Sequence, residues 1–275
     1  MKLLGTAVAI CLWLGAANAQ WITNYYESFS GSRSDLLNGK VPDISLTGAA
    51  WQAGNLFYQD GHWDTVVAGT ANGQAAWLPI TIYDGRIYRV ETVFINNNPN
   101  WLASGFFSLY PVNNSAILWT DTRWEVRHSN SGYIWALNRN NTAAGASDQQ
   151  AFVGQGTANG TTINGDHINP TGTIYMLSEL NTLQVPWRCS LLITNSLGQS
   201  VAWSGTVPDA IRSNTMVAAG TLGIRGVGLS YERSASANPG ADVDWFLVTM
   251  IPEPSAFALI GLGGLAIMLG LRRRG

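Results

Sequence analysis

The chain has 275 residues, of which 46% are hydrophobic, 11% aromatic and 12% charged, and its formal net charge is −2. Residues 20–251 carry eleven basic and sixteen acidic side chains, a net charge of about −5, which argues against nucleic acid or an anionic membrane surface as a partner. The aromatic content argues against a disordered spacer, since disordered segments are poor in aromatic residues.

The first residues have the three parts of a secretory signal peptide. Lys2 supplies a charged start, an apolar run extends from Gly5 to Ala16, and Ala17-Asn18-Ala19 is a small-x-small cleavage site. We therefore predict a signal peptide over residues 1–19, cleaved by signal peptidase so that the mature chain begins at Gln20.

One cysteine remains after this cleavage. Cys11 lies in the middle of the signal run, so Cys189 has no partner for an intrachain disulfide. Cys189 alternates with Leu191 and Ile193, which predicts that all three lie on the buried face of one strand.

The middle of the chain consists of short apolar or alternating runs separated by Gly, Asn, Asp and Pro, which indicates an all-β fold. The clearest strand is 86–95, in which Tyr88, Val90, Thr92 and Phe94 share one face. Asp84-Gly85 is a turn dipeptide that follows the run 77–83, so we expect an antiparallel hairpin there. Further strands are expected over 105–110, 116–120, 133–138, 173–180, 187–194, 200–204 and 241–250, with a turn at 195–198 and long loops over 138–147 and 154–169.

Two groups of acidic residues are candidate ligand sites. Asp60-Gly61-His62-Trp63-Asp64 combines carboxylates, an imidazole and an indole; it suits a cation or a sugar ring, and equally an ordinary turn with Trp63 in the core. Asp242 and Asp244 lie on one face of the last strand. They could bind calcium or sugar hydroxyls, or they could be the exposed start of the strand. We expect the opposite face, Val243, Trp245 and Leu247, to be buried.

The last residues combine a short motif, an apolar run and a basic cluster. Pro252-Glu253-Pro254 precedes residues 256–271, which have no charge, and Arg272, Arg273 and Arg274 follow. As a helix the run would measure about 24 Å, slightly less than the hydrocarbon core of a bilayer, and the arginines would hold its far end in the cytoplasm.

This tail resembles the PEP-CTERM proteins of Gram-negative bacteria, which are defined by these three parts in this order. The resemblance covers Pro252 to Arg274. It implies recognition by an exosortase, removal of the tail, and delivery to the cell surface or an extracellular polysaccharide matrix. A plain C-terminal membrane anchor is the alternative.

The two ends of the domain resemble concanavalin A-like jelly rolls of exported bacterial proteins. The opening residues Glu27-Ser28-Phe29-Ser30, Leu37-Asn38-Gly39, Pro42-Asp43 and Trp51 match their start, and 242–248 matches their closing strand. The resemblance implies an antiparallel β-sandwich over residues 20–250 with its first and last strands adjacent, flanked by the signal peptide helix and by a sorting tail over 251–275 with a transmembrane helix.

No catalytic residue is predicted. The Glu-x-Asp-x-x-Glu pattern of glycosidases in that superfamily does not begin at Glu91 or at Glu125, which we interpret as solvated strand residues. The histidines, His62, His128 and His167, are not at zinc-ligand spacing. Besides calcium at the aspartates, no cofactor is indicated.

The sequence is consistent with three functions of different classes. The favoured one is a non-enzymatic surface or matrix protein that binds extracellular polysaccharide; the others are a glycan-active enzyme with an unusual site and a purely structural coat component. A tryptophan with an exposed indole could stack on a sugar, and Trp101, Trp119, Trp124 and Trp135 lie near expected loops.

Overall fold

The computed structural model describes residues 20–32, 35–53, 58–59, 63–64, 74–95, 101–107, 123–128, 134–139, 149–151, 172–206, 224–232 and 243–251. The predicted signal peptide and all of the sorting tail after Ile251 lie outside these ranges. Within them, no helix has the length and apolarity that crossing a membrane requires.

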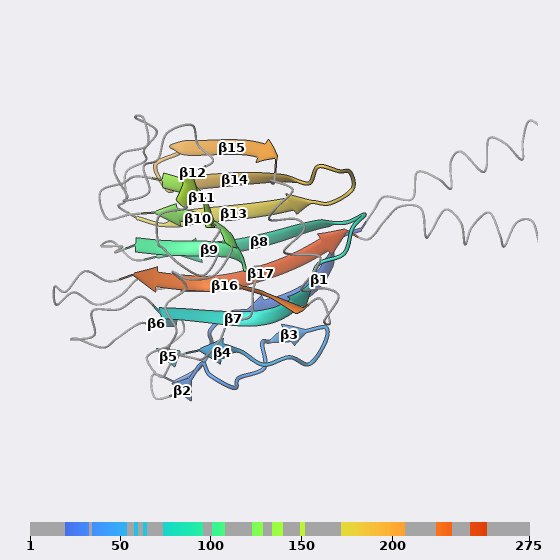
Figure 1. The fold of residues 1–275 in the computed structure, drawn as a ribbon. Helices are drawn as coiled ribbons and strands as arrows, with labels where there is room; N and C mark the ends of the chain where they lie inside the picture. The colour runs from blue at the N-terminus through green and yellow to red at the C-terminus, as the bar shows by residue number, and fades with distance from the viewer. Residues whose placement is uncertain are drawn as a thin grey trace, which may run out of the picture.

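The described residues form two antiparallel sheets that pack face to face (Figure 1). Sheet A contains β1 (Ile22–Glu27), β2 (Asp35–Leu36), β3 (Ile44–Ser45), β5 (Tyr58–Gln59), β6 (Trp63–Asp64), β8 (Ile87–Phe94), β13 (Ile174–Asn181), β14 (Arg188–Asn195), β15 (Ser200–Thr206) and β17 (Val243–Ile251). Sheet B contains β4 (Gln52–Ala53), β7 (Gln74–Thr81), β9 (Trp101–Phe107), β10 (Arg123–His128), β11 (Ile134–Arg139), β12 (Gln149–Ala151) and β16 (Ile224–Glu232). The predicted β-sandwich is confirmed.

Sheet A has its strands in the order β15-β14-β13-β8-β17-β6-β5-β2, and β1 pairs with both β17 and β3. The order in sheet B is β12-β11-β10-β9-β16-β7-β4. Because β1 pairs with β17, the first and last strands are adjacent, as the resemblance implied.

The core lies between the sheets and follows the alternation of the strands. Tyr88, Val90, Thr92 and Phe94 of β8 are fully buried, which confirms the predicted face of this strand. Cys189, Leu191 and Ile193 of β14 are buried as predicted, and β14 continues through the turn at 195–198 into β15.

The predicted hairpin around Asp84-Gly85 is wrong. Gly85 does turn the chain, with a φ of 79°, but β7 belongs to sheet B and β8 to sheet A, so these strands do not pair. The turn carries the chain from one layer to the other, and each strand finds partners far away in the sequence: β16 and β4 for β7, and β13 and β17 for β8.

The predicted buried face of β17 is also wrong beyond its first residue. Val243 is buried and Asp244 is exposed, as expected, but Phe246 and Val248 occupy the core, whereas Trp245 and Leu247 are only half-buried. The cause is a register shift between Val243 and Trp245, a β-bulge that exchanges the faces of the strand after Asp244.

Several other expectations can be placed. Trp101 is the first residue of β9, and Trp124 and Trp135 are the second residues of β10 and β11, so each lies at the end of a strand. Trp119, the expected strand 116–120 and the expected loop 154–169 lie outside the described residues, as does most of the loop 138–147.

Candidate functional site

The two predicted acidic sites lie on neighbouring strands of sheet A. Asp60 and Asp242 lie outside the described residues, Asp64 belongs to β6, and Asp244 is exposed on β17. Val243 pairs with Trp63, so the topology brings the strand that carries Asp64 beside the strand that carries Asp244. Within the described residues no three His, Cys, Asp or Glu side chains are grouped closely enough to hold a metal ion, and calcium at these aspartates stays a prediction.

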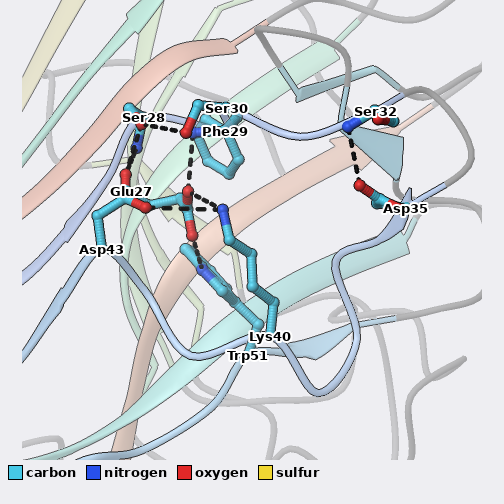
Figure 2. A network of polar contacts seen from close by, with 9 residues as sticks. All are labelled: Glu27, Ser28, Phe29, Ser30, Ser32, Asp35, Lys40, Asp43 and Trp51. Atoms are coloured by element: carbon cyan, nitrogen blue, oxygen red, sulfur yellow. Dashed lines mark hydrogen bonds and ion pairs between the residues drawn. The ribbon is translucent and has the colours of Figure 1, made fainter.

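A buried carboxylate, Glu27, organises the residues that follow β1 (Figure 2). The Lys40 ammonium lies 2.5 Å from Glu27 Oε1, the Phe29 amide donates to the same oxygen at 2.8 Å, and the Trp51 indole donates to Oε2 at 3.2 Å. We call Glu27, Phe29, Lys40 and Trp51 the N-terminal clamp, because they hold the segment 28–51 against the end of β1.

The electrostatics of the N-terminal clamp are those of a buried ion pair. Burial raises the pKa of Glu27 above its ordinary value of 4.5, and Lys40 offsets part of this rise. Partial burial raises the pKa of Asp43 as well, but hydrogen bonds from the Ser28 hydroxyl and amide, together with Lys40, outweigh it and lower that pKa overall. Glu27 and Trp51 are almost completely buried, so the clamp is a structural anchor and not a surface for a ligand.

A second group of polar and aromatic residues lies on the outer face of sheet A, away from sheet B. Because β13, β8 and β17 are neighbours, their outward residues form three rows: Tyr175, Val93 and Trp245; Leu177, Glu91 and Leu247; Glu179, Arg89 and Thr249. In Figure 1 these three strands run side by side through the middle of sheet A.

We call Trp21, Arg89, Glu91, Tyr175, Glu179 and Trp245 the platform, since they share this face and form two linked groups of three. The rings of Tyr175 and Trp245 have centroids 6.3 Å apart, and the Tyr175 hydroxyl donates to Glu91 Oε2 at 2.6 Å. Arg89 Nε donates to Glu179 Oε2 at 2.8 Å, and the Arg89 guanidinium lies 4.1 Å from the centroid of the Trp21 ring.

The side chains of the platform are partly exposed to solvent. The Arg89 side chain is 36% exposed and that of Glu179 21%, and Trp245 and Tyr175 are half-buried. Burial and the adjacent Glu91 carboxylate raise the pKa of Tyr175 well above its ordinary value, so this hydroxyl stays protonated and acts as a donor at neutral pH.

One buried hydroxyl lies beside the platform without a partner. Thr249, opposite Arg89 in the ladder, is 7% exposed, and its Oγ1 has no hydrogen-bond partner in the described part of the chain. A buried hydroxyl without a partner is destabilising, which makes it a place where an added donor or acceptor would be favourable.

Sequence reasoning missed the platform. Glu91 was expected to be solvated, yet it is half-buried and accepts a hydrogen bond from Tyr175. Alternation within 86–95 and 173–180 does place Arg89, Glu91, Tyr175 and Glu179 on outward faces, so this signal was present. The position of Trp245 could not be found in this way, because the bulge at Asp244 reverses the alternation.

The fold of this chain is similar to that of lectins among the solved structures. Arcelin-5, a lectin-like defense protein from Phaseolus vulgaris, is 10% identical with a TM-score of 0.50, covering 84% of this chain and 97% of its own. Lectin I-B4 from Griffonia simplicifolia is 11% identical with a TM-score of 0.50, covering 84% and 99%. The endo-1,3-beta-glucanase from Streptomyces sioyaensis is 13% identical with a TM-score of 0.48, covering 86% and 99%.

Residues 251–274 match the PEP-CTERM protein-sorting motif, which confirms the resemblance found at the end of the sequence. The chain is therefore an exported protein that is sorted by an exosortase, and its C-terminal tail is membrane-anchored before processing. A comparison with curated protein sequences gave no match.

Proposed function

We propose that this exported protein is not an enzyme and binds an extracellular polysaccharide on the platform. The observation that carries the proposal is the half-buried Tyr175–Trp245 ring pair beside the Glu91 carboxylate on the outer face of sheet A. The faces of aromatic rings suit the apolar C–H surface of a sugar, while carboxylates and a guanidinium suit its hydroxyls.

The length of the platform favours a polymeric ligand. The platform extends over three neighbouring strands and over rows from Tyr175 to Glu179, which at about 3.4 Å per residue is roughly 14 Å along the strand. A surface of this length can contact several consecutive sugar units. A surface location within a polysaccharide matrix would supply such a ligand continuously.

The polar groups of the platform suit ligand binding better than hydrolysis. A glycosidase needs one carboxyl group to donate a proton and a second about 5 to 9 Å away to act as nucleophile or base. Here Glu179 is held by Arg89, and Glu91 by the Tyr175 hydroxyl. These contacts fix the carboxylates as acceptors for sugar hydroxyls, which supports binding without bond cleavage.

The experiment is a polysaccharide and glycan-array screen of the mature protein, followed by affinity measurement on Trp245→Ala. Loss of an anchor ring should weaken binding by about tenfold, or about 1.4 kcal/mol. Tyr83→Ala is the matched control, because Tyr83 is 51% exposed but lies outside the platform, and it should bind normally. Equal binding by Trp245→Ala and the wild type would refute the platform.

Two further arms separate the alternatives. If a chelator abolishes binding while Trp245→Ala does not, the ligand is held by calcium at Asp242 and Asp244 and not by the platform. Reducing-sugar release by the wild type that is lost in Glu91→Gln would show an enzyme. A protein that binds no glycan of the array would favour the structural coat function.

Processing follows from the two ends of the sequence. We expect the surface-extracted protein to begin at Gln20 and to lack Arg272, Arg273 and Arg274, because signal peptidase and an exosortase remove the segments on either side. Intact-mass measurement checks both ends at once. A mass that includes the three arginines would mean that the tail is a permanent anchor.

A further inference from the structure

The sorting tail leaves the sandwich at an end that also carries two short connections. Ile251, the last residue of β17, pairs with Ile87, the first residue of β8, and Ile87 pairs with Asn181, the last residue of β13. The β7–β8 connection, 82–86, and the β13–β14 connection, 182–187, therefore lie beside the point where the tail begins. We call these two connections the tail end; Figure 1 shows the β13–β14 hairpin and the tip of β17 on the same side.

The two connections of the tail end are fastened to each other. The Gly85 amide donates to the Thr182 carbonyl at 2.8 Å, and the Thr182 hydroxyl donates to the Tyr83 carbonyl at 2.7 Å. The buried Trp187 indole donates to Asp84 Oδ1 at 2.7 Å. These bonds across the two connections make the tail end a defined surface.

This surface exposes apolar side chains. Tyr83 is 51% exposed, Leu183 46% and Val185 61%. The Arg86 guanidinium lies 4.4 Å from the centroid of the Tyr83 ring. Aliphatic residues with a tyrosine and an arginine are the combination that prefers the boundary between lipid headgroups and acyl chains.

The covalent chain keeps this surface close to the bilayer. The uncharged run of the tail begins at Ala256, five Cα–Cα steps after Ile251, so even a fully extended connection spans at most about 18 Å. We infer that the tail end rests on the lipid interface while the tail anchors the protein, with Leu183 and Val185 inserted among the headgroups. The exported part has a net charge of about −5, so this contact rests on apolar insertion and not on attraction to anionic lipid.

The test uses the full chain after signal removal, reconstituted by its own tail into phosphatidylcholine vesicles. Leu183→Cys and Val185→Cys are each labelled with an environment-sensitive fluorophore. Cys189 does not compete, because it is buried and burial raises the pKa of its thiol to about 12. We expect a blue shift of the emission and quenching by lipids that carry a spin label on the upper acyl chain.

Leu197→Cys is the matched control. Leu197 is 63% exposed in the β14–β15 turn, at the opposite end of β14 from the tail end, and its label should keep the emission it has in water. Far-ultraviolet circular dichroism confirms that each labelled protein is folded. Equal, water-like emission at Leu183, Val185 and Leu197 would overturn the inference. So would a label at Leu183 that responds only when exosortase is added, since the surface would then serve the enzyme and not the lipid.

Discussion

Replacing Lys40 by Met tests the buried ion pair of the N-terminal clamp. Glu27 is completely buried, and Lys40, whose side chain is 23% exposed, is its charged partner. Removing one member of a buried pair costs about 3 to 5 kcal/mol, because the other charge remains without its partner. Since Lys40 is partly exposed and the Phe29 amide and Trp51 indole still bind Glu27, we expect about 3 kcal/mol at pH 7.

The loss of unfolding free energy in Lys40→Met should depend on pH, and the raised pKa of Glu27 fixes the direction of this dependence. A carboxyl group whose pKa is higher in the folded state binds its proton more tightly there, so it favours the fold below its unfolded pKa and opposes it as pH rises through the folded pKa. Lys40 lowers the pKa of Glu27 in the folded state, so Lys40→Met should widen the difference between the folded and unfolded pKa of this carboxyl group. The destabilisation should therefore shrink from about 3 kcal/mol at pH 7 to under about 1 kcal/mol near pH 4, where Glu27 is protonated in both proteins.

Urea unfolding followed by tryptophan fluorescence at both pH values measures this difference. Arg89→Met is the control, because the Arg89–Glu179 pair is substantially exposed and its loss should cost at most about 1 kcal/mol. A Lys40→Met protein that loses under about 1 kcal/mol at pH 7, or loses the same amount at both pH values, would show that Glu27 is not held as a buried charge by Lys40.

Two further predictions concern packing and use the same unfolding assay. Phe246→Ala should cost about 3 to 5 kcal/mol and Trp245→Ala clearly less, because the bulge buries the first ring and leaves the second half-buried; the reverse order would contradict the observed register. Gly228→Ala should cost several kcal/mol, since a Cβ there would lie 2.1 Å from the Ala76 carbonyl oxygen, whereas Gly198→Ala, with nothing within 4 Å and only a φ of 78° to strain it, should cost about 1 to 2 kcal/mol. Equal losses would show that the close approach at Gly228 is relieved elsewhere.

The strands of sheet A could largely be predicted from the sequence because their alternation is regular. In β8 and β13 every second residue is buried, and such a pattern is visible without a partner strand. The strand β16 was not predicted, because Gly226 and Gly228 interrupt its apolar pattern. The structure explains the second glycine: β16 pairs with β7 so closely at Ala76 that a side chain has no room.

The pairing of strands could be predicted less well than their positions. Asp84-Gly85 indicates a turn, and a turn is what the chain makes there, but a dipeptide does not say whether the chain returns to the same sheet. In a sandwich, the energy of burying Leu78 and Ile80 of β7 against the opposite sheet decides which strands pair. The strand that pairs with β7 is β16, which lies more than a hundred residues away in the sequence.

The bulge in β17 connects the fold to the proposed function more directly than any motif does. Without the register shift at Asp244, Trp245 and Leu247 would continue the buried face of Val243, and Phe246 would be turned outward. The extra residue turns a tryptophan to the outer face, where it meets Tyr175 and, through Tyr175, the Glu91 carboxylate. A bulge is a local defect in pairing that has no sequence pattern of its own, so a binding surface that depends on one becomes visible only in the folded chain.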